Sequence, residues 1–130
     1  YVYLNYGIHS LVNAVTGPVG HPAAVLIRAL DPVEGLPLMR ERRGAGTRPL
    51  RDADLCRGPG NLTRALGITL RENRLDLTRG ALRIEDRGLR VPAIAWGPRI
   101  GIRVGVDRPW RCWVPAHPAV SGPRHRAQPG

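Results

Sequence analysis

The order of hydrophobic and polar positions in the first thirty residues predicts three β-strands. Residues 1–6 (YVYLNY) alternate among β-forming residues and end at the turn residue Gly7. Residues 9–16 (HSLVNAVT) predict a second strand, which stops at a Gly-Pro pair. Residues 23–30 (AAVLIRAL) are apolar almost throughout and could form a buried strand or a short helix. Their length and the flanking Gly and Pro residues favour a central strand.

The middle of the chain carries helical signals separated by turns. Residues 33–43 suit a short helix with a basic last turn, because cations are favourable at a helix C-terminus. Residues 44–54 are polar, contain arginines and predict a loop. Residues 55–62 (LCRGPGNL) predict a turn that opens a helix from about Asn61 to Leu66, and Gly67 is its expected end.

The C-terminal third returns to strand-like and extended patterns. Residues 81–86 (ALRIED) and 99–106 (RIGIRVGV) alternate as strands do. Residues 109–121 are extended and proline-rich, and residues 122–130 predict a disordered tail. A chain of 130 residues fits one domain. We therefore expect a mixed α/β (α+β) domain over residues 1–121, with a mainly antiparallel, curved sheet surrounded by short helices.

The charge balance indicates a polyanionic partner. All 20 basic residues are Arg, and only 10 acids oppose them, which gives a net charge of +10. A compositional bias of the source would explain the choice of Arg over Lys, but not the excess over acids. Such an excess is the electrostatic signature of nucleic-acid binding. The sequence has no amphipathic basic helix and no apolar run long enough to span a bilayer, so we expect no membrane partner.

Metal and cofactor motifs are absent from the sequence. The four histidines and two cysteines show no spacing typical of metal ligands, so solvated or core histidines are the simpler interpretation. Cys56 and Cys112 are far apart in sequence, and we interpret them as reduced thiols of a cytosolic protein. There is no phosphate-binding loop with its Lys and no Gly-x-Ser-x-Gly nucleophile motif. We expect neither a metal nor an organic cofactor.

The aromatic residues are distributed unevenly. The chain has no Phe, and its three tyrosines all lie in the first six residues. On an alternating strand Tyr1, Tyr3 and Asn5 share one face, and Tyr6 projects from the end beside a glycine turn. An aromatic ladder that packs across strands is the simpler interpretation of this cluster alone. The large positive charge favours base stacking instead, since each stacked base contributes about 1–3 kcal/mol.

Several blocks of the chain resemble the alkyladenine (3-methyladenine) DNA glycosylases of base excision repair. The blocks occur in the family's order and cover nearly the whole chain. They are residues 1–9 (YVYLNYGIH), 13–15 (NAV), 24–36 (AVLIRALDPVEGL), 55–62 (LCRGPGNL), 99–102 (RIGI) and 109–114 (PWRCWV), and the resemblance reaches Ser121.

The resemblance implies a base pocket on the first strands. Tyr3 would stack on a damaged base that has been flipped out of the duplex. Asn13 would lie at the floor of the pocket and discriminate against the 2-amino group of guanine. Arg28 would hold the flipped nucleotide, which would explain a cation in an otherwise apolar run. Extruding a base costs a few kcal/mol, and a stacking pocket offsets this cost.

The resemblance also implies contacts with the DNA around that base. Tyr6 would be the wedge that enters the minor groove and fills the gap, with Ile8 and His9 against the same groove. Candidate contacts with the DNA backbone are Arg57, Asn61, Arg64 and His117. Asn61 stands where the family often has Lys or Arg, and His117 replaces a small or amide residue. Cys112 and Trp113 stand where Phe and Tyr are common, which we expect the core to tolerate.

The implied reaction is hydrolysis of the N-glycosidic bond of an alkylated or deaminated purine in duplex DNA, with water as the nucleophile. The family's catalytic carboxylate lies in a block that we expect upstream of Tyr1, so no acid of this chain is nominated as catalytic. The absence of Lys favours a monofunctional enzyme, because strand cleavage uses an amine. We expect a monomer in the bacterial cytoplasm, associated with the nucleoid.

Two alternatives remain open at the level of sequence. The 130 residues could act as a non-catalytic basic DNA-binding module, and for the isolated chain we expect DNA binding without base excision. The other alternative is an RNA-associated or ribosome-associated basic domain, and it rests on the positive charge alone.

Overall fold

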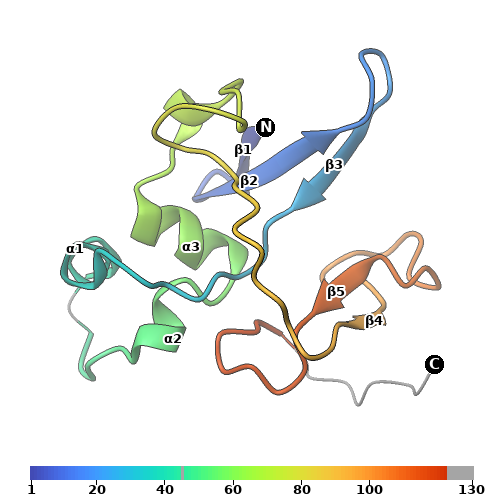
Figure 1. Cartoon of the computed structure of the whole chain (residues 1–130). Helices are drawn as coiled ribbons and strands as arrows, with labels where there is room; N and C mark the ends of the chain where they lie inside the picture. Colours follow the sequence, from blue (N-terminus) through green and yellow to red (C-terminus); the bar gives the residue numbers. More distant parts are fainter. Residues whose placement is uncertain (45, 123–130) are drawn as a thin grey trace.

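In the described residues, two small antiparallel sheets and three α-helices make up the fold (Figure 1). The computed structural model describes residues 1–44 and 46–122. The tail that the sequence predicts lies outside the described residues from residue 123 onward. The first sheet has the order β1-β2-β3, with β1 (Val2–Asn5), β2 (His9–Thr16) and β3 (Ala23–Leu26). The second sheet pairs β4 (Ala95–Gly97) with β5 (Arg111–Trp113). The predicted mixed α/β class with antiparallel strands is confirmed.

The first sheet follows the predicted strands, with one correction. β1 and β2 pair antiparallel from Val2 opposite Val12 to Asn5 opposite His9. β3 was predicted to be the central strand, and that prediction is wrong, because β2 lies between β1 and β3. β3 ends after four residues and leaves Val25 exposed to solvent. None of residues 23–30 is fully buried, as expected of an edge strand and the segment that follows it.

Helices follow the first sheet along the chain. They are α1 (Leu36–Arg43), α2 (Asp52–Leu55) and α3 (Pro59–Leu66), followed by a 3₁₀ turn, η1 (Leu70–Glu72). α3 packs against β2, while α1 packs against α3. α1 has the predicted basic last turn. α3 ends as predicted at Gly67, which has a left-handed φ of 70°, and the N–H of Ile68 donates to the carbonyl of Thr63. α2 was missed: the predicted polar loop turns helical at its end, where Leu55 is fully buried.

The core lies between β2 and α3. Its buried members are Val2, Val12, Leu55, Cys56, Leu62, Ala65 and Ile68. The buried Thr63 hydroxyl lies 2.6 Å from the carbonyl oxygen of Ser10 and 3.0 Å from that of Gly60, and its single proton is donated to one of them or shared between them. α3 is therefore joined to the β1–β2 hairpin both by apolar packing and by a side-chain hydrogen bond.

Two predicted strands do not form. In residues 81–86 the Arg83 guanidinium pairs with Glu85, a carboxylate that Arg87 also contacts, and the segment is not paired to a strand. In residues 99–106 Gly101 and Gly105 have φ of 74° and 68°, values outside the β region. The second sheet instead uses residues 95–97, which the sequence pattern missed, and residues 111–113, which lie inside the predicted extended segment.

Candidate nucleic-acid interface

The β1–β2 hairpin presents Tyr6 at its tip. Tyr6 and Gly7 have positive φ angles of 51° and 65°, and the N–H of Ile8 donates to the carbonyl of Asn5 at 3.2 Å. This is the conformation that an Asn-Gly pair would normally occupy. A left-handed Tyr costs about 1–2 kcal/mol, yet its side chain is 91% exposed and gains little packing in return. Such strain at a projecting aromatic residue indicates a functional role.

One face of the first sheet carries the aromatic and polar residues that the sequence singled out. The rings of Tyr1 and Tyr3 are stacked, with centroids 5.5 Å apart and an interplanar angle of 23°. Tyr3 lies opposite Leu11 in the register, and Asn13 is two residues further along β2 on the same face. Asn13 is only 8% exposed, and its side-chain Nδ2 donates to the carbonyl of Tyr1 at 3.3 Å.

Arg28 lies next to this face, just beyond the end of β3. The N–H of Ile27 donates to the carbonyl of Val12, so the pairing with β2 continues one residue past Leu26. By strand alternation Arg28 then points to the same face as Asn13. Burial lowers the pKa of Arg28, and its Nε is buried without a hydrogen-bond partner among the described residues. An arginine remains charged at neutral pH, so the site holds an incompletely satisfied cation.

Arg111 is a second buried cation at this site, and the sequence analysis did not assign it a role. Its guanidinium stacks on the Trp113 ring at 4.3 Å, and its Nη2 donates to the carbonyl of Ser121 at 2.9 Å. Burial, and then the nearby charge of Arg28, lower the pKa of Arg111. Ser121 also reaches the carbonyl of Arg28, at 3.5 Å from its Oγ. Two neighbouring cations in a partly buried place favour an anionic ligand.

The four candidate contacts to the DNA backbone all make contacts within the chain. Arg57 donates from Nε to the carbonyl of Val120 at 3.0 Å, and Asn61 donates from Nδ2 to the carbonyl of Arg57 at 2.8 Å. Arg64 donates from Nε to the carbonyl of Arg42, and the His117 ring lies 3.4 Å from an oxygen of Asp31. Arg64 and Asn61 remain exposed, whereas Arg57 and His117 are half-buried. Their role at DNA stays a prediction.

The described residues give no support for a metal or an enclosed pocket at this face. None of them forms a group of three or more His, Cys, Asp or Glu side chains that could hold a metal ion. A hollow of about 620 Å³ lies elsewhere, between the end of α3 and the following segment, where Leu66, Ile68, Leu75 and Leu82 line it. On the face of the first sheet, Asn13 is buried, and Tyr3 and Arg28 are half-buried.

Comparison with known proteins decides the family. The profile of the methylpurine-DNA glycosylase family matches residues 1–118. This chain belongs to that family. A Burkholderia cenocepacia (strain HI2424) relative is 51% identical over 125 residues, a span that covers 94% of this chain and 59% of the relative. A Nocardia farcinica (strain IFM 10152) relative is 48% identical over 127 residues, covering 95% of this chain and 58% of the relative. Both are provisionally named 3-methyladenine DNA glycosylase.

This member of the methylpurine-DNA glycosylase family spans about three-fifths of the length of the curated relatives that it matches. Within the part of the chain that the structure describes, no helix is long and apolar enough to cross a membrane. Neither cysteine forms a disulfide. Burial raises the pKa of the Cys56 thiol, an effect that the Arg43 charge partly opposes, so Cys56 is a neutral core residue.

Gly60 allows α3 to approach His9 of the β1–β2 hairpin closely, and its replacement gives a test. A Cβ at this position would lie 3.0 Å from Cγ of His9 and 3.2 Å from its Cβ. We expect Gly60→Ala to lower the free energy of unfolding by about 1–2 kcal/mol, although Ala is normally the better helix residue. Urea denaturation measures the effect. Adding His9→Ala removes the ring but keeps the Cβ and should restore part of the lost stability. A Gly60→Ala variant as stable as the unsubstituted chain would show that this contact is not tight.

Proposed function

We propose that this chain is the DNA-engaging part of a monofunctional DNA glycosylase that hydrolyses the N-glycosidic bond of alkylated or deaminated purines flipped out of duplex DNA. The observation that carries the proposal is the strained, exposed Tyr6 at a hairpin tip, beside a sheet face with Tyr3, Asn13 and Arg28. Membership of the methylpurine-DNA glycosylase family and the names of its bacterial relatives support the same reaction.

Each side chain has a physical role in this proposal. Tyr6 enters the stack as the base leaves and replaces the lost stacking, while Ile8, which is exposed next to it, contacts the minor groove. Tyr3 offers its ring to the face of the extruded purine. Arg28, whose Nε is buried without a hydrogen-bond partner among the described residues, attracts the phosphate of the flipped nucleotide.

Four of the ten acids of this chain have pKa values that make them poor candidates for the general base of this step. Hydrogen bonds from Arg51 lower the pKa of Asp54, and those from Arg83 and Arg87 lower the pKa of Glu85. Hydrogen bonds from Thr69 lower the pKa of Glu72, and those from Thr78 lower the pKa of Asp76. A carboxylate held below its ordinary pKa is a weaker base, whereas catalytic carboxylates are commonly tuned upward. We therefore propose that the activating carboxylate belongs to a part of the protein outside these 130 residues. These 130 residues contain no Lys, the residue that most often forms a Schiff base, which agrees with a monofunctional enzyme.

The isolated chain is expected to bind a duplex that contains hypoxanthine without releasing the base. Fluorescence anisotropy measures binding, and chromatography of the reaction mixture detects free hypoxanthine. Binding that weakens as salt rises, with no free base, would agree with the proposal. Release of hypoxanthine would show that a catalytic base lies within the chain. Failure to bind any duplex would contradict the whole proposal.

The second candidate function is a non-catalytic basic DNA-binding module. The same residues favour it, since Tyr6, Asn13 and Arg28 can bind an unstacked base without hydrolysing its bond. Both candidates share double-stranded DNA as the partner, and no observation on the described residues favours an RNA-associated domain over them.

A further inference from the structure

The segment of residues 98–110 carries cations that the proposed base site does not use. Arg99 and Arg108 both stack on the ring of Trp110, with guanidinium carbons 5.1 and 4.7 Å from the ring centroid. Trp110 is nevertheless 59% exposed. Arg103 lies exposed in the same segment, and Asp107 is the only acid there. None of the three arginines forms an ion pair with an acid among the described residues.

The arrangement is held in place by backbone contacts. The Arg99 Nη2 donates to the carbonyls of Val104 and Gly105 at 3.3 and 3.4 Å, which closes the loop on itself. Its Nε is buried and has no hydrogen-bond partner in the described chain. The N–H of Trp110 donates to the carbonyl of Arg108 at 2.8 Å. The Trp110 ring and these bonds fix the direction of the two guanidinium planes before any ligand arrives.

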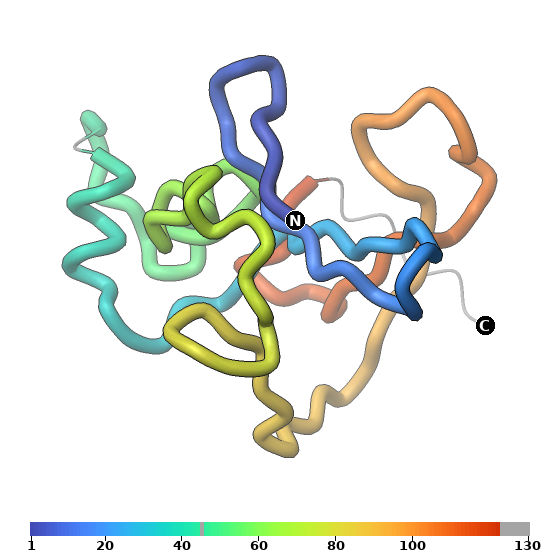
Figure 2. The backbone as a smooth tube through the Cα atoms, turned by 90° about the horizontal axis from the view of Figure 1, so that it is seen from above, coloured from blue at the N-terminus to red at the C-terminus, as the bar shows by residue number. Residues whose placement is uncertain are grey.

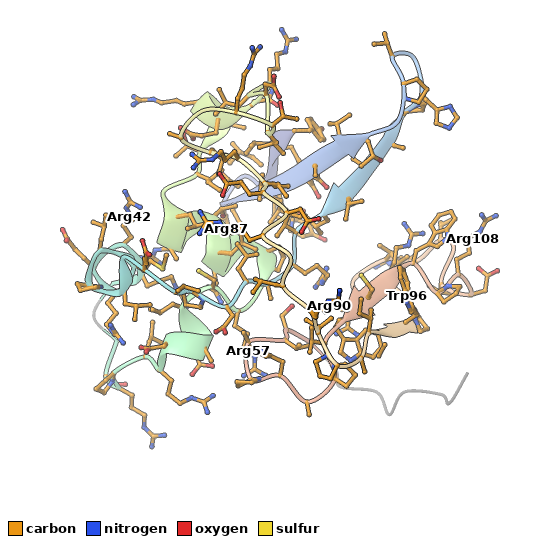
Figure 3. The ribbon with its side chains drawn as sticks, viewed as in Figure 1. Arg42, Arg57, Arg87, Arg90, Trp96 and Arg108 are labelled. Atoms are coloured by element: carbon orange, nitrogen blue, oxygen red, sulfur yellow. The ribbon has the colours of Figure 1, made fainter. Side chains whose placement is uncertain are left out.

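The loop and the proposed wedge project from the same side of the molecule. Figure 2 shows the β1–β2 hairpin in dark blue and the loop of residues 98–108 in orange, both extending toward the top of the view. The yellow segment of residues 75–90 lies on the opposite side (Figure 2). Figure 3 shows the side chain of Arg108 on the outer part of the loop, beyond Trp96 of β4. A duplex that receives the hairpin tip would therefore extend over this loop.

We propose that residues 98–110 form a second DNA-contacting arm, in which Trp110 holds Arg99 and Arg108 against the phosphates of a duplex that flanks the wedge. This inference rests on the proposed function, because the wedge defines where the duplex lies. A duplex is the occupant that fits best, since the arm has three uncompensated guanidinium groups and a planar ring and offers almost no negative charge.

The test compares two double variants of the 130-residue chain that lose the same charge. Arg99→Gln/Arg108→Gln removes two cations from the arm, and Arg79→Gln/Arg87→Gln removes two from the opposite side. Binding of a fluorescein-labelled 25-base-pair duplex is measured between 50 and 200 mM NaCl. The slope of log K against log salt should fall in magnitude by about 1.8 for the arm variant, since each lost phosphate contact changes it by about 0.9. It should change little for the control.

Two further variants keep the test decisive if the loss of Arg99 loosens the loop. Arg108→Gln alone leaves the carbonyl contacts of Arg99 intact and should lower the slope by about 0.9. Trp110→Ala keeps every charge and should weaken binding roughly fivefold through the loss of two exposed cation–π contacts. Thermal melting monitored by circular dichroism checks that each variant is folded.

The outcomes distinguish a failure of the arm proposal from a failure of the proposed function. The unsubstituted chain could bind the duplex while the arm variants and the opposite-side variant share the same slope of log K against log salt. That result would overturn the arm proposal and leave the proposed function standing. If the unsubstituted chain shows no salt-dependent binding of DNA, both are overturned. A slope that falls only in the arm variants supports the arm.

Discussion

Tyr6→Ala is expected to weaken binding of this chain to a hypoxanthine-containing duplex by about one to two orders of magnitude. The reason is that Tyr6 is 91% exposed, so nearly all of its apolar and stacking surface is available for DNA. Stacking of one aromatic ring on a base contributes about 1–3 kcal/mol. Fluorescence anisotropy at fixed salt gives the affinity, and 2-aminopurine placed beside the lesion reports base extrusion through its increase in emission.

Val19→Ala is the matched control for this experiment. Val19 is a fully exposed apolar residue at the neighbouring β2–β3 turn, so its loss removes apolar surface without removing the wedge. Tyr6→Phe should retain most of the affinity, because the ring and not the hydroxyl fills the gap. If Tyr6→Ala binds the lesion duplex as well as Val19→Ala does, the assignment of Tyr6 as the wedge is wrong.

The backbone of Tyr6 allows function to be separated from stability. Asn tolerates the left-handed region better than Tyr, so Tyr6→Asn should be at least as stable as the unsubstituted chain while binding lesion DNA as weakly as Tyr6→Ala. A protein that keeps a strained aromatic residue at an exposed tip gives up stability, and in our proposal it does so for a contact outside itself.

The first two strands could be predicted from the sequence, because their information is local. Alternation in residues 1–6 and 9–16 and the Tyr6-Gly7 turn are sufficient to predict the hairpin, and its register follows from the turn. The same is true of α3, whose end is set by Gly67. Part of the candidate site could be predicted from the sequence for the same reason, since Tyr3, Tyr6 and Asn13 all lie on the hairpin.

Features that depend on distant partners could not be predicted. The pattern of residues 99–106 alternates, but two glycines with positive φ break it, and the strand forms at residues 95–97 because residues 111–113 pair with it. The position of β3 at an edge depends on the rest of the sheet, which an apolar run does not reveal. Arg111 was missed for a similar reason: its approach to Arg28 results from the return of residues 111–121 to the first sheet.

Leu62→Ala is expected to lower the free energy of unfolding by about 3 kcal/mol. Leu62 is completely buried in the cluster that joins α3 to β1 and β2, and Leu-to-Ala changes at such sites cost about 2–5 kcal/mol. Urea denaturation followed by tryptophan fluorescence and by circular dichroism measures the change and tests whether the transition is two-state.

The effect of Leu62→Ala should extend to DNA binding, because the buried cluster around Leu62 packs against the β1–β2 hairpin that carries Tyr6. Val2 and Val12 pack on the α3 side of the hairpin, and the hydroxyl of Thr63 holds its second strand through Ser10. Leu89→Ala is the control, since Leu89 is 90% exposed and its truncation should change stability by less than about 0.5 kcal/mol. If Leu62→Ala were as stable as Leu89→Ala, α3 would not be what supports the hairpin. Leu62→Ala could instead be less stable but still bind lesion DNA normally when folded. That result would show that the turn alone positions Tyr6.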